Sequence, residues 1–321
     1  MIPRRGTGSA AGPTIVIALG GNALQPPGER GDIHQQFAHT RESLGPIVAL
    51  ARAGWRIAIV HGNGPQIGDE LLRNDRAREE RPPLPLGVLV AATAGWIGYM
   101  IQQSLRNALQ RGDVARDVVT LITQVRVEAQ ARQASPAKPV GHAMSEAEAR
   151  RLADEFGWRV EHSDDSWRRV VDSPDPVEFM ERDQVADLVR AGTIVVAAGG
   201  GGTPVRFLPD GTLDGVDAVI DKDRAAALLA RDLHAAQLLI LTRVEGAYRH
   251  FGTREQTLLE RLTASEAEQM ALAGEFGAGS MLPKIEAAVD FVRGGGEAAF
   301  IARLDQGLEA VHGEAGTTIV P

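Results

Sequence analysis

The chain has 321 residues, of which 44% are hydrophobic and 24% are charged, and its formal net charge is −8. This is the composition of a soluble globular protein, long enough for one large α/β domain or two smaller ones. The absence of cysteine excludes disulfides, cysteine-ligated zinc and thiol catalysis. Acids and arginines are interspersed without a basic stripe, so we expect no nucleic-acid partner.

The N-terminal segment combines two arginines with an apolar run, which weakly resembles a secretory signal. Gly20, Gly21 and Asn22 interrupt that run, so it is better explained as a buried strand that follows a disordered leader over residues 1–13. No other apolar run reaches the roughly 18 residues that a membrane span needs. We therefore expect a cytoplasmic protein without a membrane partner.

Short apolar runs alternate with helical patterns along the chain. Strands are predicted over 14–21, 56–64, 117–125, 193–202, 238–248 and 298–304. Helices are predicted between them over 34–53, 66–78, 95–111, 223–232, 264–273 and 283–293. This alternation predicts an α/β fold, in which helices cover both faces of an open, mainly parallel sheet. Residues 126–183 break the pattern with prolines and acids, and we interpret them as an insertion.

Three glycine-rich turns follow predicted strands, namely LGGN at 19–22, HGNGP at 61–65 and AAGGGGTPV at 197–205. Glycine lets the backbone approach a ligand closely and turn its N–H groups inward around an anion. One such turn is more often only a tight connection, but three at equivalent strand ends predict a phosphate- or anion-binding site. Neither a P-loop nor a G-x-G-x-x-G fingerprint is present, which argues against the usual nucleotide-binding folds.

Lysine is rare in this chain, because only Lys138, Lys222 and Lys284 occur among 34 basic residues. All three lie beside Gly or Pro turns. An ammonium is a compact charge with rotatable donors, so a narrow phosphate site favours lysine over arginine. Lys284 follows a proline at a predicted helix start, where the helix dipole disfavours a cation unless an anion lies between them. The alternative is that a coding bias replaced most lysines by arginine and that these three remain by chance.

Eight motifs follow one another from about residue 14 to the C-terminus, namely TIVIALGGNAL, VHGNGPQIGDE, GWIGYMIQQ, AKPVG, WRRVV, VVAAGGGGTPV, AVIDKDRAAALLA and FGAGSM.PKIEAAV. Together they closely resemble carbamate kinase, within the amino-acid kinase superfamily. The resemblance implies one domain over 14–321, a three-layer αβα sandwich around a sheet of about eight strands. Its N-terminal half would bind the substrate and residues from about 190 to 321 the nucleotide. A small lid of about 126–180 would protrude over the active site.

The glycine turns and the resemblance together assign roles to residues of this chain. Lys138, Lys222, Lys284 and Asp223 would be catalytic, with Asp223 orienting lysines. The turns that bind substrate and phosphate would comprise Gly20, Gly21, Asn22, Gly62, Asn63, Gly199, Gly200 and Gly201. The nucleotide would be bound by Thr242, Val244, Tyr248, Phe251, Gly279, Ser280 and Met281. Mg²⁺ would bind through the phosphates of ATP or ADP without a protein ligand, and the chain would form a homodimer.

The implied reaction is ATP + carbamate ⇌ ADP + carbamoyl phosphate, running toward ATP in arginine catabolism. Carbamate already carries a nucleophilic oxygen anion, so the transfer needs positioning and charge neutralisation rather than a general base. Two alternatives stay open: a kinase for another small carboxylate or carbamate-like acid, and a metabolite sensor that has lost catalysis. The sequence departs from the family pattern at Ala94, His142, Asp172 and Leu282. Asp172 replaces a proline, which predicts a looser lid and repulsion of an anionic substrate if it faces the site.

Two further motifs have a structural and a functional interpretation. His61 opens the second glycine turn, and we interpret it as a hydrogen-bonded structural residue rather than a general acid. Arg168 and Arg169 lie within WRRVV, and we interpret them as a solvated face that pins the insertion rather than as catalytic arginines.

Overall fold

The computed structural model describes residues 11–26, 29, 31–128, 137–163, 166–277 and 281–321. Most of the predicted leader falls on residues 1–10, which lie outside the described residues. Directly after them, the backbone N–H of Gly12 donates to the carbonyl of Gly54 at 3.1 Å. The described chain thus joins the fold two residues before the first strand.

A mixed sheet forms the centre of the described structure. Its strands are, in chain order, β1 (Thr14–Leu19), β2 (Arg56–His61), β3 (Val118–Thr120), β9 (Ile194–Ala197), β12 (Gln237–Thr242), β15 (Arg261–Thr263), β16 (Ala298–Arg303) and β17 (Thr317–Val320). They lie side by side in the order β15-β17-β16-β12-β1-β2-β9-β3. Neighbours pair in parallel except β16 and β17. The predicted, mainly parallel sheet of about eight strands is confirmed.

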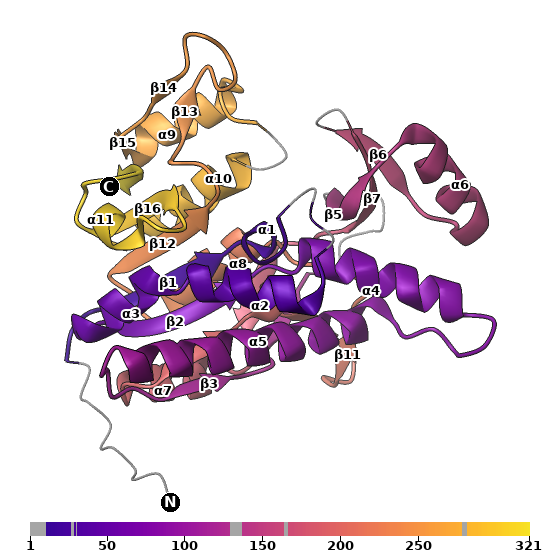
Figure 1. The fold of residues 1–321 in the computed structure, drawn as a ribbon, viewed down its shortest axis with the longest axis horizontal. Helices are drawn as coiled ribbons and strands as arrows, with labels where there is room; N and C mark the ends of the chain where they lie inside the picture. The colour runs from indigo at the N-terminus through magenta and orange to yellow at the C-terminus, as the bar shows by residue number, and fades with distance from the viewer. Residues whose placement is uncertain (1–10, 27–28, 30, 129–136, 164–165, 278–280) are drawn as a thin grey trace, which may run out of the picture.

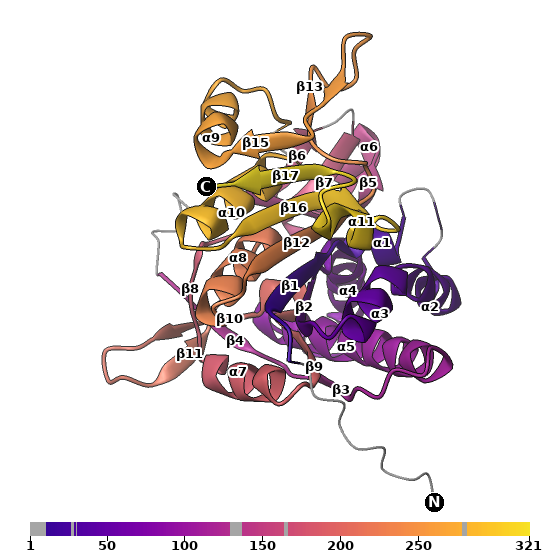
Figure 2. The same ribbon diagram turned by 90° about the vertical axis from the view of Figure 1, so that its left-hand side faces the viewer.

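Both faces of this sheet are buried, because successive side chains of a strand point to opposite faces. In β1, Val16 and Ala18 join one apolar cluster and Ile15, Ile17 and Leu19 join another. The first cluster contains residues of α7 (Arg182–Arg190), α8 (Lys222–Asp232) and α10 (Leu282–Arg293). The second contains residues of α3 (Gly45–Arg52), α5 (Leu86–Arg111) and α11 (Gly307–Val311). Helices therefore cover the sheet on both sides, as Figure 2 shows.

Several predicted elements differ from the structure where tertiary contacts decide. The helix predicted over 34–53 is two helices, α2 (Ile33–Glu42) and α3, separated at Ser43 and Leu44. The strand predicted over 117–125 splits into β3 and β4 (Gln124–Val127), which belong to different sheets. Helix α5 begins at Leu86 rather than at 95, since buried packing outweighs the low helix propensity of its glycines.

The predicted insertion contains a sheet of its own. Strands β5 (Ala137–Met144), β7 (Ser166–Asp172) and β6 (Val160–Ser163) form a three-stranded antiparallel sheet that packs against α6 (Glu146–Phe156). We call residues 137–172 the protruding subdomain, because Figure 1 shows it standing away from the main sheet. Along the chain, β4 precedes this subdomain and β8 (Pro176–Phe179) follows it. These two strands join β10 (Thr203–Phe207) and β11 (Leu213–Gly215) in a separate four-stranded sheet.

Four helices and one hairpin complete the described structure. They are the helices α1 (Gly21–Leu24), α4 (Gly64–Ala77), α9 (Ala264–Leu272) and η1 (Gly199–Gly201), and the hairpin of β13 (Tyr248–Arg249) and β14 (Thr257–Leu258). Figure 1 shows α9 and this hairpin projecting beside the protruding subdomain, with α1 between the two projections. Among the described helices, none has the length and apolar character that a membrane crossing requires.

Candidate active site

A pocket of about 340 Å³ opens where β1, β2 and β12 end, between the protruding subdomain and the C-terminal part of the chain. From the N-terminal half it is lined by Gly20, Gly21, Ala23, Gly62, Asn63, Gly64 and Pro65. The protruding subdomain contributes Lys138, Pro139, Gly141 and Arg168. The rest of the wall comprises Gly200, Ile220, Asp221, Lys222, Asp223, Leu241, Thr242, Arg243, Val244, Met281, Pro283 and Lys284.

The three glycine-rich turns meet at this pocket, as the sequence predicts. At Gly62 a Cβ atom would lie only 2.9 Å from Cδ of Lys222, and at Gly200 one would lie 2.4 Å from Nδ2 of Asn63. Gly200 also has a φ of +68°, which favours glycine. Its neighbours Gly199 and Gly201 are buried in η1 and are not among the lining residues. The turns thus pack closely enough around the pocket to exclude side chains.

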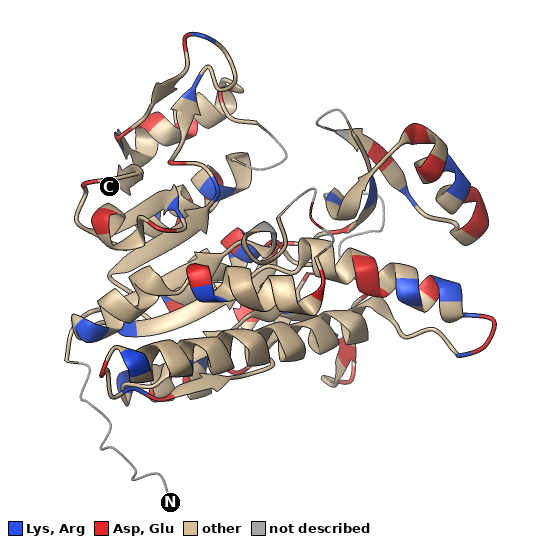
Figure 3. Ribbon diagram, viewed as in Figure 1, with Lys and Arg blue, Asp and Glu red and all other residues tan. Residues whose placement is uncertain are grey.

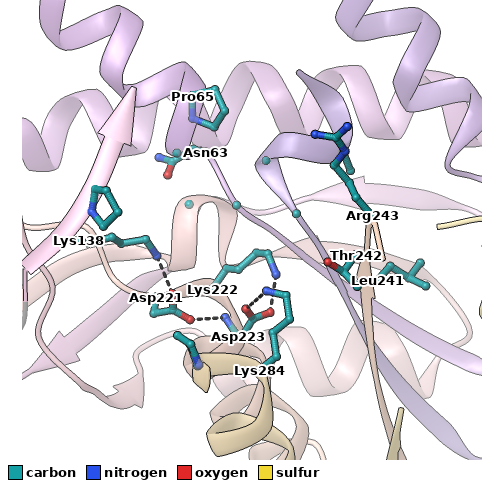
Figure 4. A pocket seen from close by; sticks show the side chains of 18 of the residues that line it. Asn63, Pro65, Lys138, Asp221, Lys222, Asp223, Leu241, Thr242, Arg243 and Lys284 are labelled. Atoms are coloured by element: carbon teal, nitrogen blue, oxygen red, sulfur yellow. Dashed lines mark hydrogen bonds and ion pairs between the residues drawn. The ribbon is translucent and has the colours of Figure 1, made fainter. Parts of the chain in front are cut away.

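All three lysines of the chain point into this pocket, where two aspartates bind them (Figure 4). Asp223 accepts hydrogen bonds from the ammonium groups of Lys222, through Oδ1, and Lys284, through Oδ2 at 2.8 Å. The side chain of Asp223 is only 4% exposed. Lys138 reaches from the protruding subdomain to Oδ2 of Asp221 at 2.9 Å and to the carbonyl of Ile220 at 3.2 Å. The two halves of the chain therefore meet at this cluster.

Known proteins align with this chain over almost its whole length. The model of the amino acid kinase family matches residues 13–303. A carbamate kinase of Pyrococcus horikoshii is 44% identical over 312 residues, covering 96% of this chain and 99% of the relative. The chain belongs to the carbamate kinases of the amino acid kinase family. A carbamate kinase of Trichomonas vaginalis is 40% identical, covering 96% of this chain and 99% of the relative.

Solved structures agree with this family membership. The carbamate kinase from Giardia lamblia bound to citric acid superposes with a TM-score of 0.91 at 36% identity, covering 97% of this chain and 99% of the other. The same enzyme bound to AMP-PNP gives a TM-score of 0.86 at 36% identity, with the same shares covered. The resemblance stated from the motifs is thus confirmed, as is the three-layer fold that it implied. The roles of individual residues stay predictions.

Asp221 is the member of the charged cluster to which the sequence analysis gave no role. Its Oδ1 caps α8 by accepting from the backbone N–H groups of Asp223 (2.8 Å) and Arg224 (3.3 Å), while its Oδ2 binds Lys138. One side chain therefore fixes the start of α8 and holds the lysine of the protruding subdomain. Its position directly before Lys222, at a predicted helix start, was the only signal available in the sequence.

The charges of the cluster perturb one another strongly. Burial raises the pKa of Asp221, but the ammonium groups of Lys138, Lys222 and Lys284 together outweigh that effect, and the net pKa lies well below its usual range. Burial likewise opposes ionisation of Asp223, and the charges of Lys222 and Lys284 still lower its pKa. Burial lowers the pKa of Lys222, and the charge of Lys284 adds to the effect. Burial also acts to lower the pKa of Lys284, but the carboxylates of Asp223 and Asp221 outweigh it and the net pKa is raised. Both aspartates are therefore ionised at neutral pH.

Lys284 lies near the start of a helix, where its positive charge interacts unfavourably with the helix dipole. Helix α10 begins at Leu282 with Pro283 in its first turn, and no side chain caps it. A cation at this position is favourable only with an anion nearby. Asp223 supplies a counter-ion, because its carboxylate accepts a hydrogen bond from the Lys284 ammonium. The same carboxylate holds Lys222, so the two lysines share one counter-ion.

The predicted nucleotide-binding residues divide into three groups. Thr242, Val244 and Met281 line the pocket. Tyr248 and Phe251 lie in the β13–β14 hairpin, with their ring centroids 5.9 Å apart, and are not among the lining residues. Gly279 and Ser280 lie outside the described residues. Asn22 is in α1, directly after the pocket residue Gly21.

The structure separates the two arginines that the sequence grouped. Arg168 lines the pocket, whereas Arg169 forms an ion pair with Asp75 of α4 at 2.7 Å. His61 is fully buried behind the second glycine turn, where its Nδ1 lies 3.1 Å from the carbonyl oxygen of Gly62, and it is not a lining residue. Arg169 therefore holds the protruding subdomain, and Arg168 has access to a ligand.

Burial of His61 predicts a pH dependence of stability. Burial lowers its pKa from 6.5 to about 4, so the folded chain holds this imidazole neutral where the unfolded chain protonates it. The contribution of the neutral, buried His61 to the stability of the fold is complete above pH 6.5. It is lost as the pH falls toward 4, because the unfolded chain then gains a proton that the folded chain does not bind. The unfolding free energy should drop between pH 7.5 and 4.5 by roughly 2–3 kcal/mol more in wild type than in His61→Gln. Urea unfolding at both pH values measures this, with His142→Gln at an exposed histidine as the control.

The four departures from the family pattern all lie outside the pocket lining. Ala94 is buried in α5, His142 is exposed in β5, and Leu282 begins α10. The carboxylate of Asp172 pairs with Arg159 at 2.6 Å, and its backbone carbonyl accepts from the N–H of Val219 at 3.0 Å. The expected repulsion of an anionic substrate was conditional on Asp172 facing the site, and this condition is not met, because the carboxylate pairs with Arg159 and is not a lining residue.

Neutralising Asp172 should accordingly have little effect on catalysis. In Asp172→Asn, we expect KM for an acyl phosphate and KM for ADP to stay within about twofold of wild type. The pair with Arg159 is partly exposed, so its loss should lower the unfolding free energy by on the order of 1 kcal/mol and leave substrate binding unchanged. Steady-state kinetics with each substrate varied in turn measures both constants. A severalfold drop in the acyl-phosphate KM would restore the repulsion hypothesis.

Proposed function

We propose that this chain transfers a phosphoryl group reversibly between ATP and carbamate. One observation carries the proposal: three lysine ammonium groups converge on two aspartates at the meeting point of three glycine-rich turns. Three ammonium groups against two carboxylates leave one net positive charge, in a pocket where Arg168 and Arg243 add two more. Such a pocket suits a polyphosphate and a small acid better than a neutral ligand.

We propose a division of labour among the pocket residues during transfer. The turn at Gly62 and Asn63 begins α4 and would hold the small acid, while Thr242, Val244 and Met281 would hold the nucleotide. Lys138 would approach the transferred group from the protruding subdomain, and Lys222 and Lys284 would neutralise charge from the nucleotide side. Asp223 keeps both of these ammonium groups in fixed positions, so little reorganisation is needed as charge moves during the reaction.

We also propose that Mg²⁺ accompanies the nucleotide. Asp221 and Asp223 are engaged with lysines, and the described part of the chain holds no group of three or more His, Cys, Asp or Glu side chains placed for a metal ion. This donor set fits an ion that is bound through nucleotide phosphates. When bound, the ion would neutralise phosphate charge.

A coupled assay of ATP formation tests the proposed function. With ADP, Mg²⁺ and carbamoyl phosphate, we expect ATP to form, whereas acetyl phosphate in place of carbamoyl phosphate should support much slower turnover. Preference for acetyl phosphate would favour a kinase for another small acid. Nucleotide binding without any transfer would favour the sensor. The structure gives neither alternative specific support, because the lysine cluster is intact and the departures from the family lie outside the pocket lining.

We further propose a cytoplasmic homodimer that forms ATP in arginine catabolism, on the strength of the family likeness. Helix α5 offers a surface for a second copy, because residues 86–105 contain no charged side chain, as Figure 3 shows. Val88 and Tyr99 on this helix are 47% and 57% exposed. Light scattering after size exclusion should give twice the chain mass for wild type and a monomer for Tyr99→Asp.

A further inference from the structure

The protruding subdomain is held against α4 by a side-chain cluster to which the proposed reaction gives no role. One oxygen of Asp75, Oδ2, accepts hydrogen bonds from Nη1 of Arg169 and Nε1 of Trp158, each at 2.7 Å. The guanidinium carbon of Arg169 also lies 4.5 Å from the ring centroid of Trp158. We call these three residues the anchor. Its ion pair is largely shielded from water, since the Asp75 and Arg169 side chains are 19% and 18% exposed.

Close packing extends the anchor toward the active site. Val140 and Val171 of the protruding subdomain share a buried cluster with Ile67 and Leu71 of α4. The strand β5 also passes so close to α4 that a Cβ atom on Gly68 would lie 2.0 Å from the Cα atom of the facing glycine. Because packed interiors transmit displacements rather than absorb them, the subdomain and α4 act as one unit.

This unit contains both Lys138 and the second glycine turn. In the β5–β7 pairing, Lys138 stands opposite Val171 and Val140 stands opposite Arg169. These four side chains therefore share one face of the subdomain sheet. At its other end, α4 begins directly after the pocket residue Asn63. The anchor thus fixes the distance between the lysine and the turn at the start of α4.

We propose that Asp75 is a positioning residue, which places Lys138 for phosphoryl transfer by anchoring the protruding subdomain to α4. Lys138 spans the pocket to reach Asp221, so a small tilt of the subdomain would carry its ammonium away from the reacting group. Misplacement of a catalytic group by about 1 Å can cost on the order of 10²-fold in rate. Asp75 itself is not a pocket residue and acts only through the subdomain. The inference rests on the proposed function.

Asp75→Asn tests the anchor while keeping the side chain's size. We expect about a tenfold lower kcat for ATP formation, with KM for ADP changed by less than about twofold, because the nucleotide side is untouched. Glu155→Gln is the matched control, since it removes an ion pair with Arg151 (2.8 Å) on the exposed face of the same subdomain. It should leave kcat unchanged.

A double-mutant cycle distinguishes positioning from a general loss of structure. Asp75→Asn should lower kcat about tenfold when Lys138 is present and less than about twofold in a Lys138→Ala background. Equal losses in the two backgrounds, or a wild-type kcat in Asp75→Asn, would overturn the proposal. If Lys138→Ala has no measurable rate, amide hydrogen exchange over 137–144 decides, because it should rise in Asp75→Asn and not in Glu155→Gln. Unchanged exchange there would also overturn it.

Two further outcomes are separable. If Asp75→Asn does not fold, Trp158→Phe replaces it, because this change removes the hydrogen bond to Asp75 while keeping an aromatic ring beside Arg169, and about a threefold loss of kcat is expected. A wild-type chain that forms no ATP contradicts the proposed function. An active wild type whose anchor variants match it contradicts the anchor alone.

Discussion

Lys222→Arg and Lys284→Arg should each fold and yet lose at least tenfold in turnover, which corresponds to about 1.4 kcal/mol of transition-state stabilisation. Both ammonium groups bind the carboxylate of Asp223, whose side chain is 4% exposed, so the site is narrow. A guanidinium is larger, planar and less able to reorient its donors as charge moves from one phosphate oxygen to another. Steady-state ATP formation with ADP and carbamoyl phosphate measures kcat for each variant.

A conservative exchange elsewhere provides the control for these variants. Arg231→Lys alters a basic residue that pairs with Asp290 on the exposed side of α8, in the same helix as Lys222. Its turnover should equal that of wild type. Wild-type rates in both lysine variants would show that the scarcity of lysine has no catalytic meaning.

The sequence allowed the core of the site to be predicted because its chemistry is written in short motifs. The glycine turns at Gly20, Gly62 and Gly200 each follow a buried strand, and the rules of parallel sheets bring such strand ends together. The scarcity of lysine identified the pocket's ammonium groups without any knowledge of the fold. These inferences needed only local spacing and the ordinary topology of an α/β sheet.

Contacts between distant segments account for what the sequence did not disclose. Lys138 and Asp221 are 83 residues apart, and so are Asp75 and Trp158, so no local pattern links either pair. Phe251 was assigned to the nucleotide from its place in a motif; it lies in a hairpin outside the pocket lining and is 64% exposed, and its role stays a prediction. Side-chain direction is set by the tertiary fold in each case.

Asp223→Asn should affect both stability and catalysis, because two buried ammonium groups would lose the charge that they share. Removing one partner of a buried ion pair typically costs about 3–5 kcal/mol, and we expect the unfolding free energy to fall by about 3 kcal/mol. Turnover should fall by on the order of 10²-fold, since Lys222 and Lys284 would no longer be held for transfer. KM for ADP should change less, because the glycine turns and the remaining cations still bind its phosphates.

An added anion distinguishes this explanation from simple damage to the fold. In Asp223→Asn the two lysines carry uncompensated charge, so pyrophosphate should bind between them and recover part of the lost stability. We therefore expect pyrophosphate to raise the melting temperature of Asp223→Asn by several degrees more than that of wild type. Asp290→Asn removes an exposed partner of Arg231 and should show neither the loss nor the added stabilisation. If pyrophosphate raises the melting temperatures of Asp223→Asn and wild type equally, the Asp223 carboxylate is not the anion that compensates the two ammonium groups.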